Sequence, residues 1–159
     1  MLKVIGICIL LFTIFRLSKA ICKKELLKVR LLSELSRFMH EMRLALSVSM
    51  KSLGEFSLEF KTDEPYLTEL LGSEFRLLES EEGAAAFREN IGDCGAEIFQ
   101  SFIFGFGRGY LESEIKRLDV IIGSFDAHLT EQKDIISRRL RVCRTLGISS
   151  SFALLILFI

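Results

Sequence analysis

Apolar residues recur every three or four positions along most of this chain, a period that predicts amphipathic α-helices. The first stripe begins at Leu27 and steps regularly to Met50, which predicts a long helix that ends near Gly54. Residues 56–60 then alternate apolar and polar side chains. This alternation fits a short strand, but because no partner strand is evident, a helical extension or a loop anchor is favoured. The stripe consists of Leu27, Leu31, Leu35, Phe38, Met42, Leu46 and Met50.

Turn residues divide the next part of the chain into a second and a third helix. Pro65 stands at a first helical position after the break at residues 62–64, and the apolar stripe then continues to Leu78. Residues 80–83, Ser-Glu-Glu-Gly, place acidic side chains at a helix amino end, where the helix dipole favours them. A short helix is therefore expected over residues 84–91.

The last two predicted helices contain the strongest apolar patterns. Gly92 and Gly95 bracket a boundary, and residues 96–104 are so apolar that we expect the most buried helix there. A final stripe has a period of 3.5 residues, which is typical of a coiled-coil seam or of the core face of a bundle helix. The other amphipathic helices favour the bundle, and a self-associating homo-oligomer stays open. The stripe consists of Leu111, Ile115, Leu118, Ile122, Phe125, Leu129, Gln132 and Ile136, and Leu140 and Cys143 extend it.

These stripes predict an all-α fold, a helical bundle of about five to six helices. A single proline argues against a β-sandwich or barrel, which needs many turns. The 21 basic and 21 acidic residues cancel, so the excess of positive charge that is typical of nucleic-acid binders is missing. Four cysteines without a Cys-x-x-Cys pair and two distant histidines predict neither a metal site nor a disulfide framework, and no cofactor is expected.

Both ends of the chain are apolar and uncharged. Residues 4–15 carry no charge over twelve positions, and residues 146–159 carry none over fourteen. At about 1.5 Å per residue, a fourteen-residue helix spans roughly 21 Å, against roughly 30 Å for a hydrocarbon core. Lys3, Arg16 and Arg144 can make up the difference by snorkelling to the interface, with local thinning of the bilayer. We therefore expect an N-terminal and a C-terminal transmembrane segment.

Charge is sorted by position. Residues 16–30 hold six basic groups and one acid, and residues 138–144 hold four basic groups and no acid; we name these segments the basic collars. Residues 31–137 hold ten basic and twenty acidic groups, a net charge of −10. The residues assigned to flank the membrane are Lys3, Arg16, Lys19, Lys23, Lys24, Arg138, Arg139, Arg141 and Arg144.

The collars predict the topology. Lysine and arginine next to a membrane segment hold that side in the cytoplasm, so the body between the collars is expected to be cytoplasmic and the chain to cross the membrane twice. The collars are expected to attract anionic lipid, whereas the acidic body is kept away from it. The predicted organisation is residues 1–22 for the first segment and its collar, 23–144 for the cytoplasmic bundle, and 145–159 for the second segment.

Other interpretations of the two ends stay open. The amino end fits a cleaved secretory signal with Ser18-Lys19-Ala20 as the cleavage site, although the basic residues that follow the apolar run favour retention. The carboxyl end also fits a buried core strand or helix. A lipid-anchor signal there would need a polar spacer of about 8–12 residues.

The residue types that carry catalysis do not form a constellation. His40 and His128 are interpreted as helix-surface histidines, and Cys94 and Cys143 as small buried residues that stay reduced in a cytosol. No nucleophile and base stand at a spacing that supports catalysis, so the chain is predicted not to be an enzyme.

Three glycines within residues 105–109 suggest a phosphate-binding loop at first sight. No strand precedes them and no Gly-Lys-Ser/Thr follows, so a helix–helix turn is favoured. Arg108 in this turn is a candidate partner contact, and so are Glu112 and Glu114 just after it. Positions two apart point to different sides of a helix, so the two glutamates cannot act as a catalytic pair.

Four segments occur along the chain in a distinctive order. They are MLKVIGICILLF at the start, the stripe LLSELSRFMHEMRLAL, the turn FGFGRGY before a long helix, and RTLGISSSFALLILFI at the end. Together they resemble the stage III sporulation protein AB family. The resemblance covers nearly the whole chain and rests on the order of the segments and the total length, since none of them is a catalytic motif.

The resemblance implies a membrane-embedded helical part of the apparatus that joins mother cell and forespore during endospore formation. It implies a place in the mother-cell membrane and a cytoplasmic domain similar to the platform protein of type II secretion and type IV pilus machines, without enzymatic activity. The implied partners are a secretion-type ATPase, stage III sporulation protein AA, and other stage III sporulation channel proteins. The acidic body would then meet basic patches on the ATPase.

Two other functions fit the sequence. An exported helical binding protein follows if the chain is cleaved after Ala20. A coiled-coil membrane scaffold unrelated to sporulation follows if the stripe from Leu111 to Ile136 pairs between chains.

Overall fold

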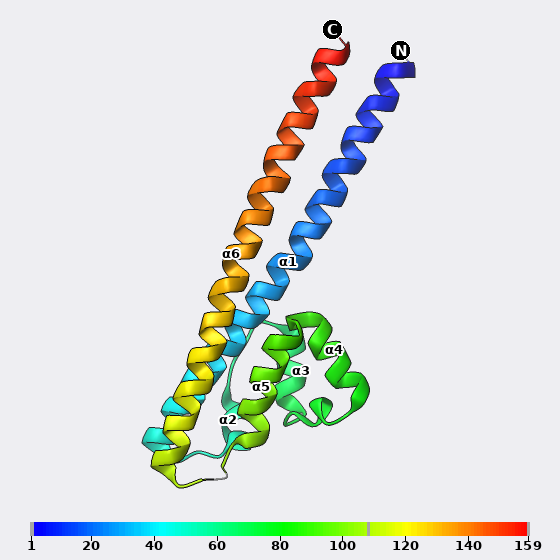
Figure 1. The fold of residues 1–159 in the computed structure, drawn as a ribbon. Coiled ribbons are helices and arrows are strands. Elements are labelled where there is room, and N and C mark those ends of the chain that lie inside the picture. Colours follow the sequence, from blue (N-terminus) through cyan, green and yellow to red (C-terminus); the bar gives the residue numbers. More distant parts are fainter. Residues whose placement is uncertain (1, 108, 159) are drawn as a thin grey trace. The chain divides into compact units, whose positions relative to one another are not determined.

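The computed structural model of the chain describes the backbone of residues 2–107 and 109–158 and the side chains of residues 13, 16, 23–107, 109–142 and 145. Within this part the fold is all-α, as the sequence predicts, and no strand occurs among the described residues (Figure 1). The elements are α1 (Leu2–Ser49), α2 (Leu53–Glu59), α3 (Pro65–Gly72), the 3₁₀ helix η1 (Arg76–Leu78), α4 (Glu81–Ile91), α5 (Asp93–Gly105) and α6 (Leu111–Phe158).

The chain divides into two compact units. Met1–Leu27 and Gln132–Ile159 form the first, which we name the hairpin unit because it consists of antiparallel segments of α1 and α6 (Figure 1). Lys28–Glu131 form the second, which we name the core unit. The domain boundaries expected from the sequence, 22/23 and 144/145, stay a prediction.

The core unit is built around α1, whose predicted stripe faces inward in its middle part, whereas Leu27 and Met50 at its two ends are exposed. Leu31, Leu35, Phe38 and Met42 are buried, as the three-four spacing predicts. The Phe38 ring lies against five other phenylalanine rings, with centroid distances between 5.2 and 6.4 Å, so it stands at the centre of an aromatic cluster. The cluster partners are Phe56, Phe60, Phe75, Phe99 and Phe102.

The end of α1 differs from the prediction. The helix stops at Ser49, and Met50 adopts a left-handed backbone with φ of 51°. Ser52 then starts α2 with a capping box: its side chain accepts from the Glu55 N–H, and the Glu55 carboxylate accepts from the Ser52 N–H. Gly54 therefore lies inside a new helix, and its expected role as the helix end is wrong. Residues 56–59, interpreted as a helical extension or loop anchor, belong to α2.

The helix that starts at Pro65 is shorter than its apolar stripe. Pro65 occupies the first turn, as predicted, but α3 ends at Gly72. Glu74 and Phe75 have φ of 50° and 65°, so the chain reverses direction and Leu78 falls in η1, which corrects the prediction of one continuous helix. Phe75 and Leu78 are buried all the same, because the turn folds them back onto the core.

The boundary between α4 and α5 rests on one glycine. Ser80 caps α4 by accepting from the Gly83 N–H, which confirms the predicted start. Gly92 separates the helices with φ of 87° and ψ of 156°, a conformation that is essentially restricted to glycine. Gly95 lies within α5 rather than at its boundary, and an added Cβ there would come within 3.2 Å of the Leu32 side chain. Its smallness therefore lets α5 pack closely on α1.

The regular stripe of α6 packs into the core of its own chain. Leu118, Ile122, Phe125 and Leu129 are buried in the same cluster as the α1 and α5 residues. The bundle interpretation is confirmed for this stretch. A coiled-coil seam between chains made of these four side chains is wrong, because they already pack within the core unit.

The two apolar ends, where transmembrane segments are expected, lie outside the residues with described side chains, apart from Thr13. Within the described part of the chain, no helix has a stretch long and apolar enough to cross a membrane.

Candidate interaction surfaces

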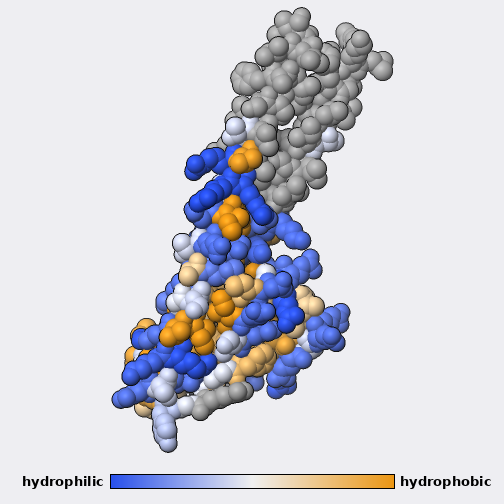
Figure 2. All heavy atoms as spheres, in the orientation of Figure 1, coloured by the Kyte–Doolittle hydropathy of each residue, from blue (hydrophilic) through white to orange (hydrophobic). Residues whose placement is uncertain are grey.

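The basic collars lie in and next to the hairpin unit. Lys23, Arg138 and Arg141 are exposed there, and Arg139 joins the two helices through an ion pair with Glu25 at 3.1 Å. On the face that Figure 2 shows, this region carries mostly hydrophilic side chains with a few apolar ones among them. Among the side chains described here, the large apolar ones that are exposed are Leu26, Leu27 and Val142.

The structure describes some of the other predicted collar side chains but not all of them. Arg16 and Lys24 are exposed, and Arg138 also contacts Asp134 on its own helix at 2.9 Å. The side chains of Lys3, Lys19 and Arg144 lie outside the described residues.

The negative charge of the core unit is concentrated in α3, α4, the start of α5 and the connections before and between these helices. Residues 28–131 hold nineteen acidic and eleven basic residues, a net charge of −8. Residues 62–100, which we name the acidic segment, hold ten of those acids and two bases, which is also −8, and the rest of the unit is balanced at nine against nine. The exposed acids of this segment are Asp63, Glu69, Glu74, Glu79, Glu81, Glu82, Glu89, Asp93 and Glu97.

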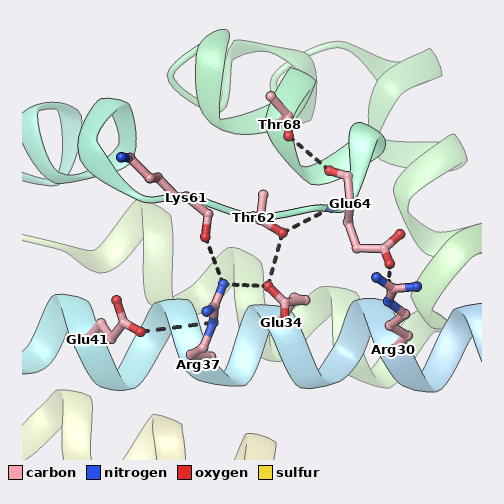
Figure 3. Close-up of polar contacts among 8 residues, drawn as sticks. All are labelled: Arg30, Glu34, Arg37, Glu41, Lys61, Thr62, Glu64 and Thr68. Atoms are coloured by element: carbon pink, nitrogen blue, oxygen red, sulfur yellow. Dashed lines mark hydrogen bonds and ion pairs between the residues drawn. The ribbon is translucent and has the colours of Figure 1, made fainter.

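A polar network holds the start of the acidic segment on α1 (Figure 3). Arg37 donates to the Glu34 carboxylate at 2.6 Å and to the Lys61 carbonyl at 2.8 Å. The Thr62 hydroxyl donates to the same carboxylate at 3.0 Å. Arg37 and Glu34 are three residues apart and lie on one face of α1. Together they fix the connection between α2 and α3 on that helix.

A second link in this network is an ion pair one step further along the connection. Arg30 contacts the half-buried Glu64 at 2.5 Å, so the residue before Pro65 is also tied to α1 (Figure 3). The sequence gives little sign of these links, because Glu34 and Thr62 are 28 residues apart and share no motif.

The turn between α5 and α6 is held by a buried carboxylate. Glu114, with 4% of its surface exposed, accepts from the Gly107 N–H at 3.1 Å and from Arg117 at 2.6 Å. Burial opposes its ionisation, but the hydrogen bonds from Arg117 and Gly107 outweigh burial and lower the pKa of Glu114 below its ordinary value of 4.5. The carboxylate therefore stays charged and keeps the turn in place.

Arg117 completes this clamp. It also donates to the Ser101 carbonyl in α5 at 3.3 Å. An added Cβ at Gly105 would come within 2.3 Å of its guanidinium, so the glycine leaves the space that Arg117 occupies. The glycines here form a helix–helix turn, as predicted, and the structure gives Glu114 an internal role. Glu112 is exposed, and Arg108 lies outside the described residues.

Helices α1 and α6 are joined in the core unit by three polar contacts that sequence reasoning missed. The Ser36 hydroxyl donates to one oxygen of Asp126 at 2.6 Å, and His40 Nε2 lies 2.8 Å from the other. Arg43 donates twice to Asp119, at 2.8 and 3.0 Å. The only signal was spacing, since the two aspartates are seven residues apart and thus share a helix face.

This arrangement does not form a catalytic triad. In a triad the histidine lies between the hydroxyl and the carboxylate, so that it can take the proton of the nucleophile. Here Asp126 lies between Ser36 and His40, and each contacts its own carboxylate oxygen. The contacts fix the two helices against each other.

Two predictions for single residues need correction. His128 is half-buried rather than on the surface: its Nε2 is buried without a hydrogen-bond partner among the described residues and lies against Gly95. Cys94 is exposed rather than buried, because it stands at the start of α5 on the side away from the core. The Cys143 side chain lies outside the described residues. No group of three His, Cys, Asp or Glu residues in the described part could hold a metal ion.

The described residues define an all-α protein whose exposed basic residues gather in the collars and whose exposed acids gather in the acidic segment. Residues 3–159 match the family model of stage III sporulation protein AB, so the chain belongs to that family and has a role in sporulation. The resemblance seen in the order of its segments is thereby confirmed. No curated protein and no solved structure matches the chain.

Proposed function

We propose that the chain is a non-enzymatic membrane platform of the channel complex between mother cell and forespore, and that it docks the secretion-type ATPase of that complex. The separation of the basic collars from the acidic segment carries the proposal. Eleven basic residues lie outside residues 31–137, whereas the negative charge of the core unit lies in residues 62–100. Such separation suits a protein that meets a membrane and a protein partner through different surfaces.

The membrane part of the proposal rests on the chain ends. Residues 4–15 and 146–159 are uncharged and apolar, and each is followed on the body side by a collar. Two passes through the mother-cell membrane, with the core unit in the cytoplasm, satisfy the positive-inside rule at both ends. The Glu25–Arg139 ion pair joins the collars of the two helices.

The docking part of the proposal rests on the acidic segment. Six of its nine exposed acids stand on α3, α4 and α5, and the other three lie in the connections before and between these helices. The connection that leads into the segment is held on α1 by Arg30 and Arg37. A fixed, negatively charged face attracts a basic partner surface and orients it during encounter. The ATPase would supply that basic surface.

The test is capture of the purified ATPase by the full chain in lipid nanodiscs. A variant with Glu69→Lys and Glu97→Lys changes two exposed acids of the acidic segment, and a control with Glu41→Lys and Glu131→Lys makes the same charge change outside it. We expect the first variant to weaken capture roughly tenfold, about 1.4 kcal/mol, and the control to weaken it much less. Wild-type capture should also fall as salt rises.

Three results would contradict the proposal. Capture that does not respond to salt would exclude docking led by charge. Equal effects of the two variants would remove the acidic segment as the docking face. Amino-terminal sequencing that finds a mature chain beginning after Ala20 would favour the exported binding protein instead.

A further inference from the structure

The outer side of the α1–α6 pair in the core unit carries an open hollow of about 410 Å³. Leu44 on α1 and Ile122 and Gly123 on α6 form its apolar lining. An added Cβ at Gly123 would meet nothing within 4 Å, so the hollow is open above this glycine. The hydrogen-bonded residues His40 and Asp126 and the ion pair Arg43–Asp119 line the rest of the hollow.

Apolar side chains continue from this hollow along both helices. Leu44 is 57% exposed, and Val48, one turn further along α1, is 78% exposed. On α6, Val120 is 70% exposed and stands three residues before Gly123, so it is a neighbour on the helix surface. Large apolar side chains that are clustered and exposed are typical of a surface that binds another protein.

The charge distribution indicates which partner fits. The net charge of −8 in the core unit comes from the acidic segment, so two copies would repel each other if they met there. The hollow instead places the basic Arg43 of α1 beside the acidic Asp119 of α6, with His40 and Asp126 next to them. A two-fold axis brings α1 of one copy opposite α6 of the other, and such a face is then complementary to itself.

We propose that two copies of this chain associate through the α1–α6 hollow, with Arg43 of each copy facing Asp119 of the other. The apolar residues Leu44, Val48 and Val120 pack at the centre of this contact. Of the stripe that suggested self-association in the sequence, only Ile122 borders the hollow, because Leu118, Phe125 and Leu129 are buried in the core. The inference stands apart from docking of the ATPase, because it uses another face.

A charge-swap experiment tests this contact without disturbing the fold. A chain with Arg43→Asp and Asp119→Arg keeps the ion pair within each copy in reversed order. Dimers of two wild-type or two swapped chains therefore keep complementary charges. In a mixed dimer, Arg43 of the wild-type copy would face the arginine introduced at position 119 of the swapped copy. At the second contact, Asp119 of the wild-type copy would face the aspartate introduced at position 43, so like charges would meet at both contacts.

The two full-length chains carry different affinity tags and are co-expressed and solubilised in mild detergent. Light scattering gives the oligomeric state of each chain alone, and sequential purification gives the share of mixed dimers. We expect dimers of each chain alone and a mixed share at least about fivefold below the binomial value. A binomial share, or a wild-type chain that is monomeric at every concentration, would overturn the proposal.

A second variant addresses the apolar centre. Gly123→Glu puts a negative charge of each copy into the hollow, and Gly72→Glu is its matched control, because an added Cβ meets nothing within 4 Å at either position. We expect the first change to raise the dimer dissociation constant at least about tenfold and the second to leave it within about twofold. Dimers that persist in Gly123→Glu at wild-type affinity would show that another face associates.

Discussion

Glu114 and Glu112 are two residues apart in the same first turn of α6, yet they stand in opposite environments. Glu114 is buried and accepts hydrogen bonds from Arg117 and Gly107, whereas Glu112 is exposed. Replacing Glu114 by glutamine leaves Arg117 without its charge partner and weakens the bond to the turn. We expect Glu114→Gln to lower the unfolding free energy by about 2 kcal/mol, and Glu112→Gln to change it by less than about 0.5 kcal/mol. Urea unfolding of the full chain in detergent, followed by circular dichroism, measures both, and equal effects would contradict the clamp.

The lowered pKa of Glu114 also predicts how this stabilisation depends on pH. A carboxyl group with a folded pKa below its unfolded value stabilises the fold above the unfolded pKa, and this stabilisation is lost as pH falls through the folded pKa. The pKa of Glu114 lies below 4.5, so the gap in unfolding free energy between wild type and Glu114→Gln should be full at neutral pH and shrink below about pH 4.5. The other carboxyl groups are present in both proteins, so their contributions cancel in the difference between the two unfolding free energies. A gap that widens in acid would contradict the assignment.

The sequence predicts that Glu112 and Glu114 lie on different sides of a helix, but not which of the two is buried. The spacing of Glu112 and Glu114 placed them on different sides of a helix, and the structure confirms this. Spacing alone does not say which side is buried. That depends on Gly107 and Arg117, which reach Glu114 only because the chain turns sharply between α5 and α6.

The boundary between α4 and α5 depends on the backbone of Gly92. Its φ of 87° and ψ of 156° are strained for any residue with a Cβ, so Gly92→Ala should cost about 1–3 kcal/mol of unfolding free energy. Gly54→Ala is the control: Gly54 lies inside α2 with open space around it, and alanine favours helix, so a gain of up to about 1 kcal/mol is expected. Thermal unfolding of the two variants under identical conditions compares them. A neutral Gly92→Ala would show that the boundary relaxes at no cost.

Helices were easier to predict than their ends. The inward stripes of α1 and α6 follow from three-four spacing, because one face of each helix must be buried, whereas α5 was predicted from its apolar content. The ends of α1 and α3 were missed since Met50 and Phe75 adopt left-handed backbones that residues other than glycine rarely take. One available signal was overlooked: Ser52 and Glu55 form a Ser-x-x-Glu capping box, which marks the start of α2.

At the scale of the whole molecule, charge was the property that sequence described best. The collars and the net negative charge of residues 31–137 follow from counting residues along the chain, because neighbours in sequence stay neighbours on a helix. The contacts of Asp119 and Asp126 with α1 join residues 76 to 90 positions apart, and no local pattern could pair them. The hollow between these helices was likewise invisible in the sequence, since it is formed by both helices together.

The collars make the proposed topology testable through reporters. If both collars stay in the cytoplasm, a phosphatase that is active only outside the cytoplasm should be active when fused after residue 159, since the second apolar end would carry it across. The same phosphatase fused after Arg141 replaces that end and should be inactive. Reversing Arg138, Arg139 and Arg141 to glutamate weakens the second collar, so activity of the fusion at 159 should fall while the total amount of protein is checked by immunoblot. High activity of the fusion after Arg141 would place the core unit outside the cytoplasm and would remove the ATPase as its partner.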